Sequence, residues 1–190
     1  MSRNILGKPE ENIVRKIVIT YGLISGAIIT FLFLLSMYLW QKGIINFDNG
    51  EYFGYGSMLV ALLMVFFGIK SFRDNQNGKS IGFWKGAQVG ILISLLASFV
   101  YAASWEVYMQ VSPENKFVEK YSEHYIGKLK ENGASQEEID RTTSEMASMQ
   151  QMYKNPIIRF GMVLLEILPV GFIVTLLSAA ILRKKEVLAE

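Results

Sequence analysis

The sequence predicts an all-α membrane protein with four transmembrane helices and an extracytoplasmic helical hairpin between the third and the fourth. Three observations favour this fold class. Hydrophobic residues make up 51% of the chain. They are concentrated in four runs of about 18 residues or more, a length that crosses the hydrocarbon core of a bilayer. Aromatic and basic residues flank these runs, and a polar stretch at 110–155 separates the last two.

The four apolar runs predict spans at about 17–40, 52–69, 83–108 and 157–182, in a single membrane domain that comprises residues 1–190. The first run ends in Tyr38, Leu39 and Trp40, an aromatic set typical of the membrane interface. It is also longer than the apolar region of a cleaved signal peptide. We therefore expect the first span to remain in the protein as a membrane anchor.

The distribution of basic residues predicts the orientation. Lys and Arg lie before the first span, after the second and after the fourth: Arg3, Lys8, Arg15, Lys16, Lys70, Arg73, Lys79, Arg183, Lys184 and Lys185. The opposite short connection contains only Lys42. Because basic loops remain in the cytoplasm, we expect a multi-pass four-helix bundle in the bacterial cytoplasmic (inner) membrane, with the N- and C-termini cytoplasmic.

The polar stretch at 110–155 is expected to contain two helices. The first is predicted to begin with Ser112 as its cap and Pro113 at its first position. Ser135 and Glu138 form a capping box for the second, which Asn155-Pro156 ends. Each helix has an apolar face, formed by Phe117, Tyr121, Tyr125 and Leu129 and by Ile139, Met146, Met149 and Tyr153. We expect the pair to lie on the membrane surface or over the outer mouth of the bundle.

Composition argues against most catalytic and cofactor chemistry. The chain has no cysteine, which removes disulfides and thiolate metal sites, and its one histidine, His124, is expected to be an exposed surface residue. The net charge of +2 is too small to indicate nucleic acid as a partner. Phosphate-binding loops, dinucleotide fingerprints and zinc-protease motifs are absent from the sequence. We expect no enzyme activity, no metal and no cofactor.

Several short motifs follow one another in a familiar order. They are Gly68-Ile69-Lys70, Arg73-Asp74, Asn77-Gly78, Phe83, Lys85-Gly86, Gly90, Leu92 to Ser94, Trp105, Asn155-Pro156, Glu166 to Gly171 and Thr175-Leu176. In these motifs the chain resembles the bacterial membrane family catalogued as domain of unknown function 4199. The resemblance covers nearly the whole chain and implies the fold and the location, but no catalytic or binding residues.

Small residues recur at every fourth position of the third span, as Gly86, Gly90, Ser94, Ser98 and Ala102. The first span has a shorter series that begins with Gly22 and Gly26. In lipid, small side chains allow helix backbones to approach closely. We expect the first and third spans to pack together through these residues. Homodimerisation is one alternative, and a parallel repeat of two helix pairs, with Gly22 aligned on Gly86, is another.

Two acidic residues, Glu106 and Glu166, lie within the third and fourth spans. Placing an acid at a helix centre in a membrane costs about 3 kcal/mol, so such groups usually face the bundle and have partners. Both acids are expected in the outer half of the bilayer, where they could meet and share a proton in a relay. In the alternative, Glu106 lies among headgroups, and Glu166 pairs with Arg159, two turns away on the same helix.

These features predict a structural or accessory component of the membrane. The alternative is a small-solute or proton/cation transporter that uses Glu106 and Glu166. The expected partners are the lipid bilayer and a second membrane protein or another copy of the chain.

Overall fold

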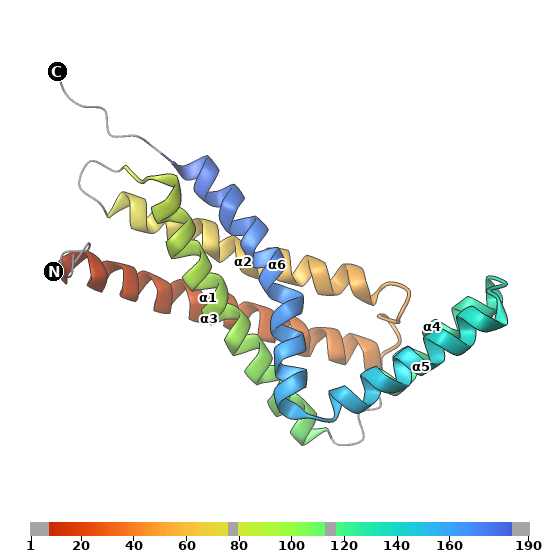
Figure 1. Cartoon of the computed structure of the whole chain (residues 1–190). Helices are drawn as coiled ribbons and strands as arrows, with labels where there is room; N and C mark the ends of the chain where they lie inside the picture. The colour runs from red at the N-terminus through yellow and green to blue at the C-terminus, as the bar shows by residue number, and fades with distance from the viewer. Residues whose placement is uncertain (1–7, 76–79, 113–116, 184–190) are drawn as a thin grey trace.

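The computed structural model describes residues 8–75, 80–112 and 117–183. Over these residues the chain forms six helices (Figure 1), which are α1 (Lys8–Gln41), α2 (Gly50–Asp74), α3 (Phe83–Val111), α4 (Phe117–Glu131), α5 (Gln136–Tyr153) and α6 (Pro156–Leu182). Four of them, α1, α2, α3 and α6, are long and apolar enough to cross a membrane, and we call these the long helices. The all-α class is confirmed. The expected four-helix bundle describes only part of the structure, because the described residues also form the two shorter helices α4 and α5.

The long helices extend beyond the apolar runs from which they were predicted. α1 begins at Lys8 and carries Glu10 and Glu11 in its first turn, where negative charge is favourable for the helix dipole. α2 continues to Asp74, with Arg73 in its last turn. Backbone hydrogen bonds continue into these polar turns, so an apolar run marks only the part of a helix suited to hydrocarbon.

The long helices are joined by hydrogen bonds from small hydroxyl side chains. Ser25 Oγ in α1 donates to the Ala61 carbonyl in α2 at 2.7 Å. The hydroxyls of Thr30 in α1 and Ser104 in α3 lie 2.9 Å apart. Such short side chains satisfy their own polarity while they let the backbones approach closely, which suits helices that pack in an apolar environment.

Glycines mark the closest approaches between the helices. A Cβ at Gly26 of α1 would lie 2.6 Å from Val100 Cβ of α3, so α1 and α3 pack together there. The small residues of α3 face a different helix. A Cβ at Gly90 would lie 2.6 Å from Thr175 Cγ2 of α6, and one at Gly86 would lie 3.3 Å from Ala179 Cβ. The glycines of α1 and α3 therefore do not face each other as expected: those of α1 contact α3, whereas Gly86 and Gly90 of α3 contact α6 on its other side.

Helices α4 and α5 lie side by side and project away from the long helices (Figure 1), and we call them the α4–α5 arm. Gly133, with a φ of +75°, lies in the turn between them. Ser135 caps α5, and its Oγ accepts from the Glu138 N–H at 3.2 Å. Ser112, which was expected to cap the first polar helix, is instead the C-cap of α3, and its N–H donates to the Tyr108 carbonyl. The expected first position of that helix, Pro113, lies outside the described residues.

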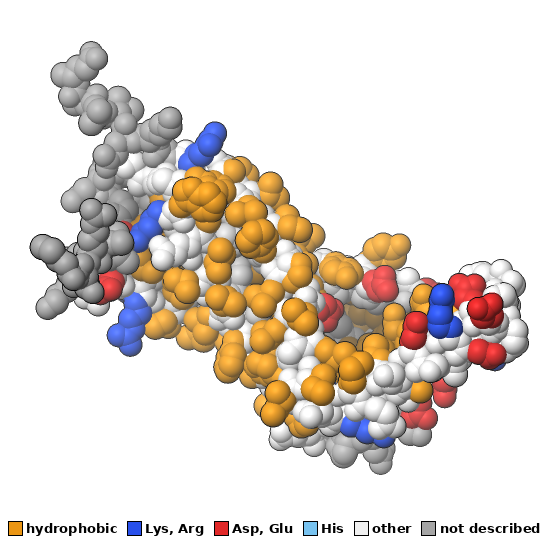
Figure 2. All heavy atoms as spheres, viewed as in Figure 1, with side chains coloured by type: hydrophobic (Ala, Val, Ile, Leu, Met, Phe, Trp, Pro, Cys, Tyr) orange, Lys and Arg blue, Asp and Glu red, His pale blue; other side chains and the backbone are white. Residues whose placement is uncertain are grey.

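The outer surface of the long helices is largely hydrophobic. Figure 2 shows hydrophobic side chains over most of this face, and charged side chains gathered on the α4–α5 arm and at the opposite end of the molecule. Leu165 is 72% exposed and Trp84 80% exposed. A continuous apolar surface of this kind is typical of helices that are surrounded by lipid.

Candidate functional site

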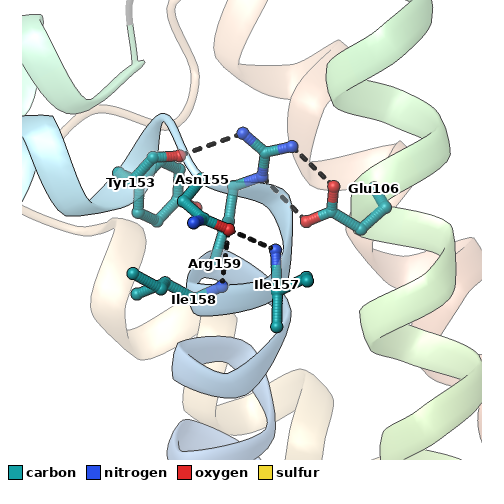
Figure 3. A network of polar contacts seen from close by, with 6 residues as sticks. All are labelled: Glu106, Tyr153, Asn155, Ile157, Ile158 and Arg159. Carbon is teal, nitrogen blue, oxygen red and sulfur yellow. Dashed lines mark hydrogen bonds and ion pairs between the residues drawn. The ribbon is translucent and has the colours of Figure 1, made fainter.

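The candidate site lies where α3, α5 and α6 meet. Asn155 and Pro156 determine where α6 begins. The Asn155 Oδ1 accepts hydrogen bonds from the N–H groups of Ile157 at 2.9 Å and Ile158 at 3.4 Å, and Pro156 takes a first-turn position where no N–H is needed. This start places Arg159 in the first turn of α6, next to the end of α5 (Figure 3).

Arg159 and Glu106 form a two-pronged ion pair between α6 and α3 (Figure 3). Arg159 Nε donates to Glu106 Oε1 at 2.8 Å, and Nη2 donates to Oε2 at 2.5 Å. The remaining nitrogen, Nη1, donates to the Tyr153 carbonyl of α5 at 3.0 Å. The side chains are only 11% and 15% exposed. One arginine therefore fastens three helices together through charge-assisted hydrogen bonds.

Two aromatic residues belong to the surroundings of this ion pair, Tyr153 at its Arg159 end and Trp105 next to Glu106 in the sequence. The Arg159 guanidinium lies 5.7 Å from the centre of the Tyr153 ring, a distance that allows a cation–π interaction. Burial raises the pKa of the Tyr153 hydroxyl, which therefore stays protonated at neutral pH. Next to Glu106 in the sequence, Trp105 is 7% exposed, and its buried Nε1 has no hydrogen-bond partner with acceptable geometry within the described part of the chain.

Glu166 is separate from the ion pair. It lies two turns farther along α6 than Arg159, and its side chain is exposed. Within the residues that the structure describes, it has no hydrogen bond or ion pair. The expected pairing of Glu166 with Arg159 is therefore wrong. Helical spacing placed both on one face of α6, but the guanidinium extends across to α3 and not along its own helix.

The two acids also do not form the expected pair. Both Glu106 oxygens are bonded to Arg159, and no contact joins Glu106 to Glu166 among the described residues. Of these two acids, Glu106 is neutralised by a basic partner, and Glu166 has none among the described residues.

The model of the family described as "Protein of unknown function (DUF4199)" matches residues 20–184. The chain belongs to this family. No curated protein and no solved structure matches it. The part of the chain that matches the DUF4199 family includes all three charged residues of the site, Glu106, Arg159 and Glu166.

Sequence reasoning missed how the α4–α5 arm of this DUF4199 member is attached. An aromatic cluster joins α4 to α1, α3 and the α1–α2 connection, with rings of neighbouring members 4.4 to 6.5 Å apart. Its members are Phe33, Trp40, Phe47, Trp105, Tyr108, Phe117 and Tyr121. The sequence signal was the helical spacing of Phe117 and Tyr121, which predicted an apolar face but not the surface that this face contacts.

Polar groups reinforce this attachment. Lys128 Nζ of α4 lies 3.0 Å from Asp48 Oδ1, and His124 Nε2 lies 3.5 Å from the same oxygen. The Lys128 hydrogen bond holds the pKa of Asp48 below its usual value. The His124 ring lies 5.2 Å from the Phe47 ring and is half-buried. The expectation of an exposed surface histidine was wrong, because α4 folds back onto the α1–α2 connection.

The residues that could bind a metal are dispersed. Among residues 8–75, 80–112 and 117–183, no group of three or more His, Cys, Asp or Glu side chains could hold a metal ion. The chemistry of the site is therefore that of a fixed ion pair and a separate carboxylate.

Proposed function

We propose that this DUF4199 protein is a non-enzymatic structural or accessory component of the bacterial cytoplasmic membrane. In this proposal the long helices cross the bilayer, both termini are cytoplasmic, and the α4–α5 arm is presented on the extracytoplasmic side. The apolar outer surface of the long helices supports the membrane crossing, and the basic flanks of the chain support this orientation. The arm offers its polar surface to a membrane-protein partner or a second copy of the chain.

The observation that carries the proposal is the bond set of Arg159. It connects α3 to α6 through Glu106 and connects both to the end of α5 through the Tyr153 carbonyl. A carboxylate held by two charge-assisted hydrogen bonds is fixed in one geometry. Such an arrangement suits a brace that sets the angle of the α4–α5 arm. It does not suit an acid that must bind and release protons during transport.

Transport is the second candidate function, and the exposure of Glu166 favours it. An acid without a protein partner at membrane depth is typical of proton or cation paths. In this alternative, Glu166 takes up the transported ion and Glu106 keeps only its structural role.

Flux measurements decide between the two functions. The purified protein is reconstituted in liposomes that contain a pH-sensitive dye, and a pH gradient is applied with and without a potassium-driven membrane potential. The accessory role predicts a proton leak equal to that of protein-free liposomes, for both the unaltered protein and Glu166→Gln. A leak that is faster with the protein and returns to the protein-free rate in Glu166→Gln would establish transport instead.

A further inference from the structure

Basic side chains gather at the end of the long helices that lies opposite the α4–α5 arm, where Figure 2 shows Lys and Arg side chains beside hydrophobic ones. Three of these residues are exposed and, within the described ranges, have no hydrogen bond or ion pair from their side chains. They are Lys16 of α1, Lys70 of α2 and Arg183 at the end of α6, and we call them the basic rim.

The acids that the structure describes at this end each have another basic neighbour. Glu10 Oε1 lies 2.9 Å from Lys85 Nζ, and Asp74 Oδ1 lies 2.8 Å from Arg73 Nη2. Glu11 lies one helical turn before Arg15 on the exposed surface of α1. The positive charges of the basic rim are therefore left over when these neighbours are matched.

Contacts between α1 and α2 place two residues of the basic rim at similar heights. A Cβ at Gly68 of α2 would lie 3.2 Å from Tyr21 Cγ of α1. Lys70 comes two residues after Gly68, and Lys16 comes five residues before Tyr21 on the antiparallel helix. At about 1.5 Å per residue, the two lysines start about 3 Å and 7.5 Å beyond this contact, toward the same end.

The third residue, Arg183, belongs to the same layer. A Cβ at Gly86 of α3 would lie 3.4 Å from Ile69 Cγ2 of α2 and 3.3 Å from Ala179 Cβ of α6. Ile69 and Ala179 are therefore at one height. Lys70 follows the first of them directly, and Arg183 follows the second by four residues, or about 6 Å.

Rows of exposed apolar side chains lead along the helices to both lysines. The row on α2 is Leu59, Leu63 and Phe67, and the row on α1 is Leu23 and Ile19. Spacings of three and four residues keep each row and its lysine on one face of the helix. An unpaired cation at the end of an apolar row matches an amphiphile with an anionic head group, whereas a water-soluble anion has no use for the row.

We propose that the basic rim binds the phosphate head groups of anionic phospholipids, whose acyl chains lie along the exposed apolar rows. Clustered Lys and Arg beside membrane helices attract anionic lipids in this way. The inference rests on the bilayer crossing in the proposed function, and in the proposed orientation the lipids belong to the cytoplasmic leaflet. It adds a selectivity for lipid that the orientation alone does not imply.

The test measures which lipids contact the full-length protein in a bilayer. The protein is reconstituted in phosphatidylcholine with a trace of phosphatidylglycerol or phosphatidylcholine that carries a spin label near the end of one acyl chain. Electron paramagnetic resonance separates labelled lipid held at the protein surface from mobile lipid. We expect a preference for phosphatidylglycerol of about threefold or more. The preference should fall in about 1 M salt, where the Debye length is about 3 Å.

Matched variants locate the preference. A rim variant combines Lys16→Gln, Lys70→Gln and Arg183→Gln, and it should reduce the preference for phosphatidylglycerol by about half or more. Lys16→Arg with Lys70→Arg keeps the charges and should keep the preference. The control removes the same charge from exposed lysines of the arm and its end, through Lys120→Gln, Lys130→Gln and Lys154→Gln, and should also keep it.

The phosphatidylcholine label separates failure of this proposal from failure of the bilayer crossing, and it also shows whether each variant is inserted. No held lipid with either label would overturn both. Held phosphatidylcholine without a preference for phosphatidylglycerol would overturn the lipid proposal alone, as would equal preferences in the rim and arm variants. Loss of the preference when inorganic phosphate replaces chloride at equal ionic strength would also contradict it, because the rim would then bind free phosphate.

Discussion

Two acids on the long helices have opposite surroundings. Glu106 is held by both prongs of the Arg159 guanidinium and is almost covered, whereas Glu166 is exposed and has no ionic partner among the described residues. Removing one partner of a buried ion pair leaves an uncompensated charge, which costs more than the pair itself contributes. The same residue type is therefore fixed in an ion pair at one position and has no ionic partner among the described residues at the other.

The ion pair makes a specific prediction for stability. Glu106→Gln should lower the free energy of unfolding by about 3 kcal/mol, because the Arg159 charge is then buried without a counter-charge. Arg159→Gln should have a similar effect for the same reason. The double variant should lose clearly less than the sum of the two, since neither charge remains. Denaturation in mild detergent measures all three.

An exposed pair supplies the control. Arg141 Nε lies 3.9 Å from Glu145 Oε1 on the α5 surface, so Arg141→Gln should change stability by less than about 0.5 kcal/mol. Additive losses in the Glu106 and Arg159 double variant would show that the two side chains are not coupled.

At the scale of helices, the close packing of α3 on α6 depends on residues that lack bulk. Gly90 faces Thr175 and Ile69, and Gly171 faces Ser94, whose hydroxyl lies 3.3 Å from that of Thr175. Helices in lipid gain little from burying apolar surface, so contact area and hydrogen bonds of this kind hold them together. Gly161, on an open part of α6, has no neighbour within 4 Å of where a Cβ would be.

Two alanine substitutions test this packing. Gly90→Ala should lower stability by about 1–3 kcal/mol, because its Cβ would lie 2.6 Å from Thr175 Cγ2 and 2.9 Å from Ile69 Cδ1. Gly161→Ala, on an open part of α6, should be neutral or stabilising by up to about 1 kcal/mol, since alanine is the better helix former. Thermal melts in detergent compare the two. Equal losses would mean that α3 and α6 are farther apart than described.

The contact of α4 with the α1–α2 connection predicts a pH dependence. The pKa of Asp48 is lowered in the folded protein, mainly by its hydrogen bond with Lys128. Its contribution to docking is therefore complete above its usual value of 3.8 and is lost as the pH falls through the lowered value. Hydrogen exchange of α4 should accelerate between about pH 4 and pH 2 beyond the intrinsic pH effect.

Asp48→Asn is the matched variant for this experiment. Without the carboxylate, α4 should exchange faster at neutral pH and lose the additional acceleration in acid. High salt should shift the unaltered protein toward the variant, because the groups are exposed to solvent. The same acid response in the variant would assign the effect to another group.

At the scale of the whole molecule, sequence patterns predicted the features that depend on neighbouring residues in the chain, namely the lengths and ends of helices. Run length predicted the long helices, the capping box predicted the start of α5 after Ser135, and Asn155-Pro156 predicted where α5 ends. The partner of Arg159, the helix faced by Gly90 and the attachment of the α4–α5 arm were not predicted. Each depends on which helices become neighbours, and periodicity within one helix does not contain that information.

The same limit applies to Glu166 of α6. The depth of Glu166 was evident from the sequence, but its exposure depends on which helices pack around α6. Glu166 was expected to pair with Arg159 because the two residues lie at helical spacing on α6. The structure instead pairs Arg159 with Glu106 of the neighbouring helix α3.

The central claim is that the long helices cross the bilayer and present the α4–α5 arm outside the cytoplasm. Fusions to a reporter enzyme that is active only outside the cytoplasm test it most directly. Fusions after Gly133, in the turn of the arm, should be active, and fusions after Asn75 and Arg183, at the opposite ends of α2 and α6, should be inactive. Activity after Asn75 or Arg183 together with an inactive Gly133 fusion would reverse the orientation, and equal activity at all three sites would contradict the membrane-spanning arrangement.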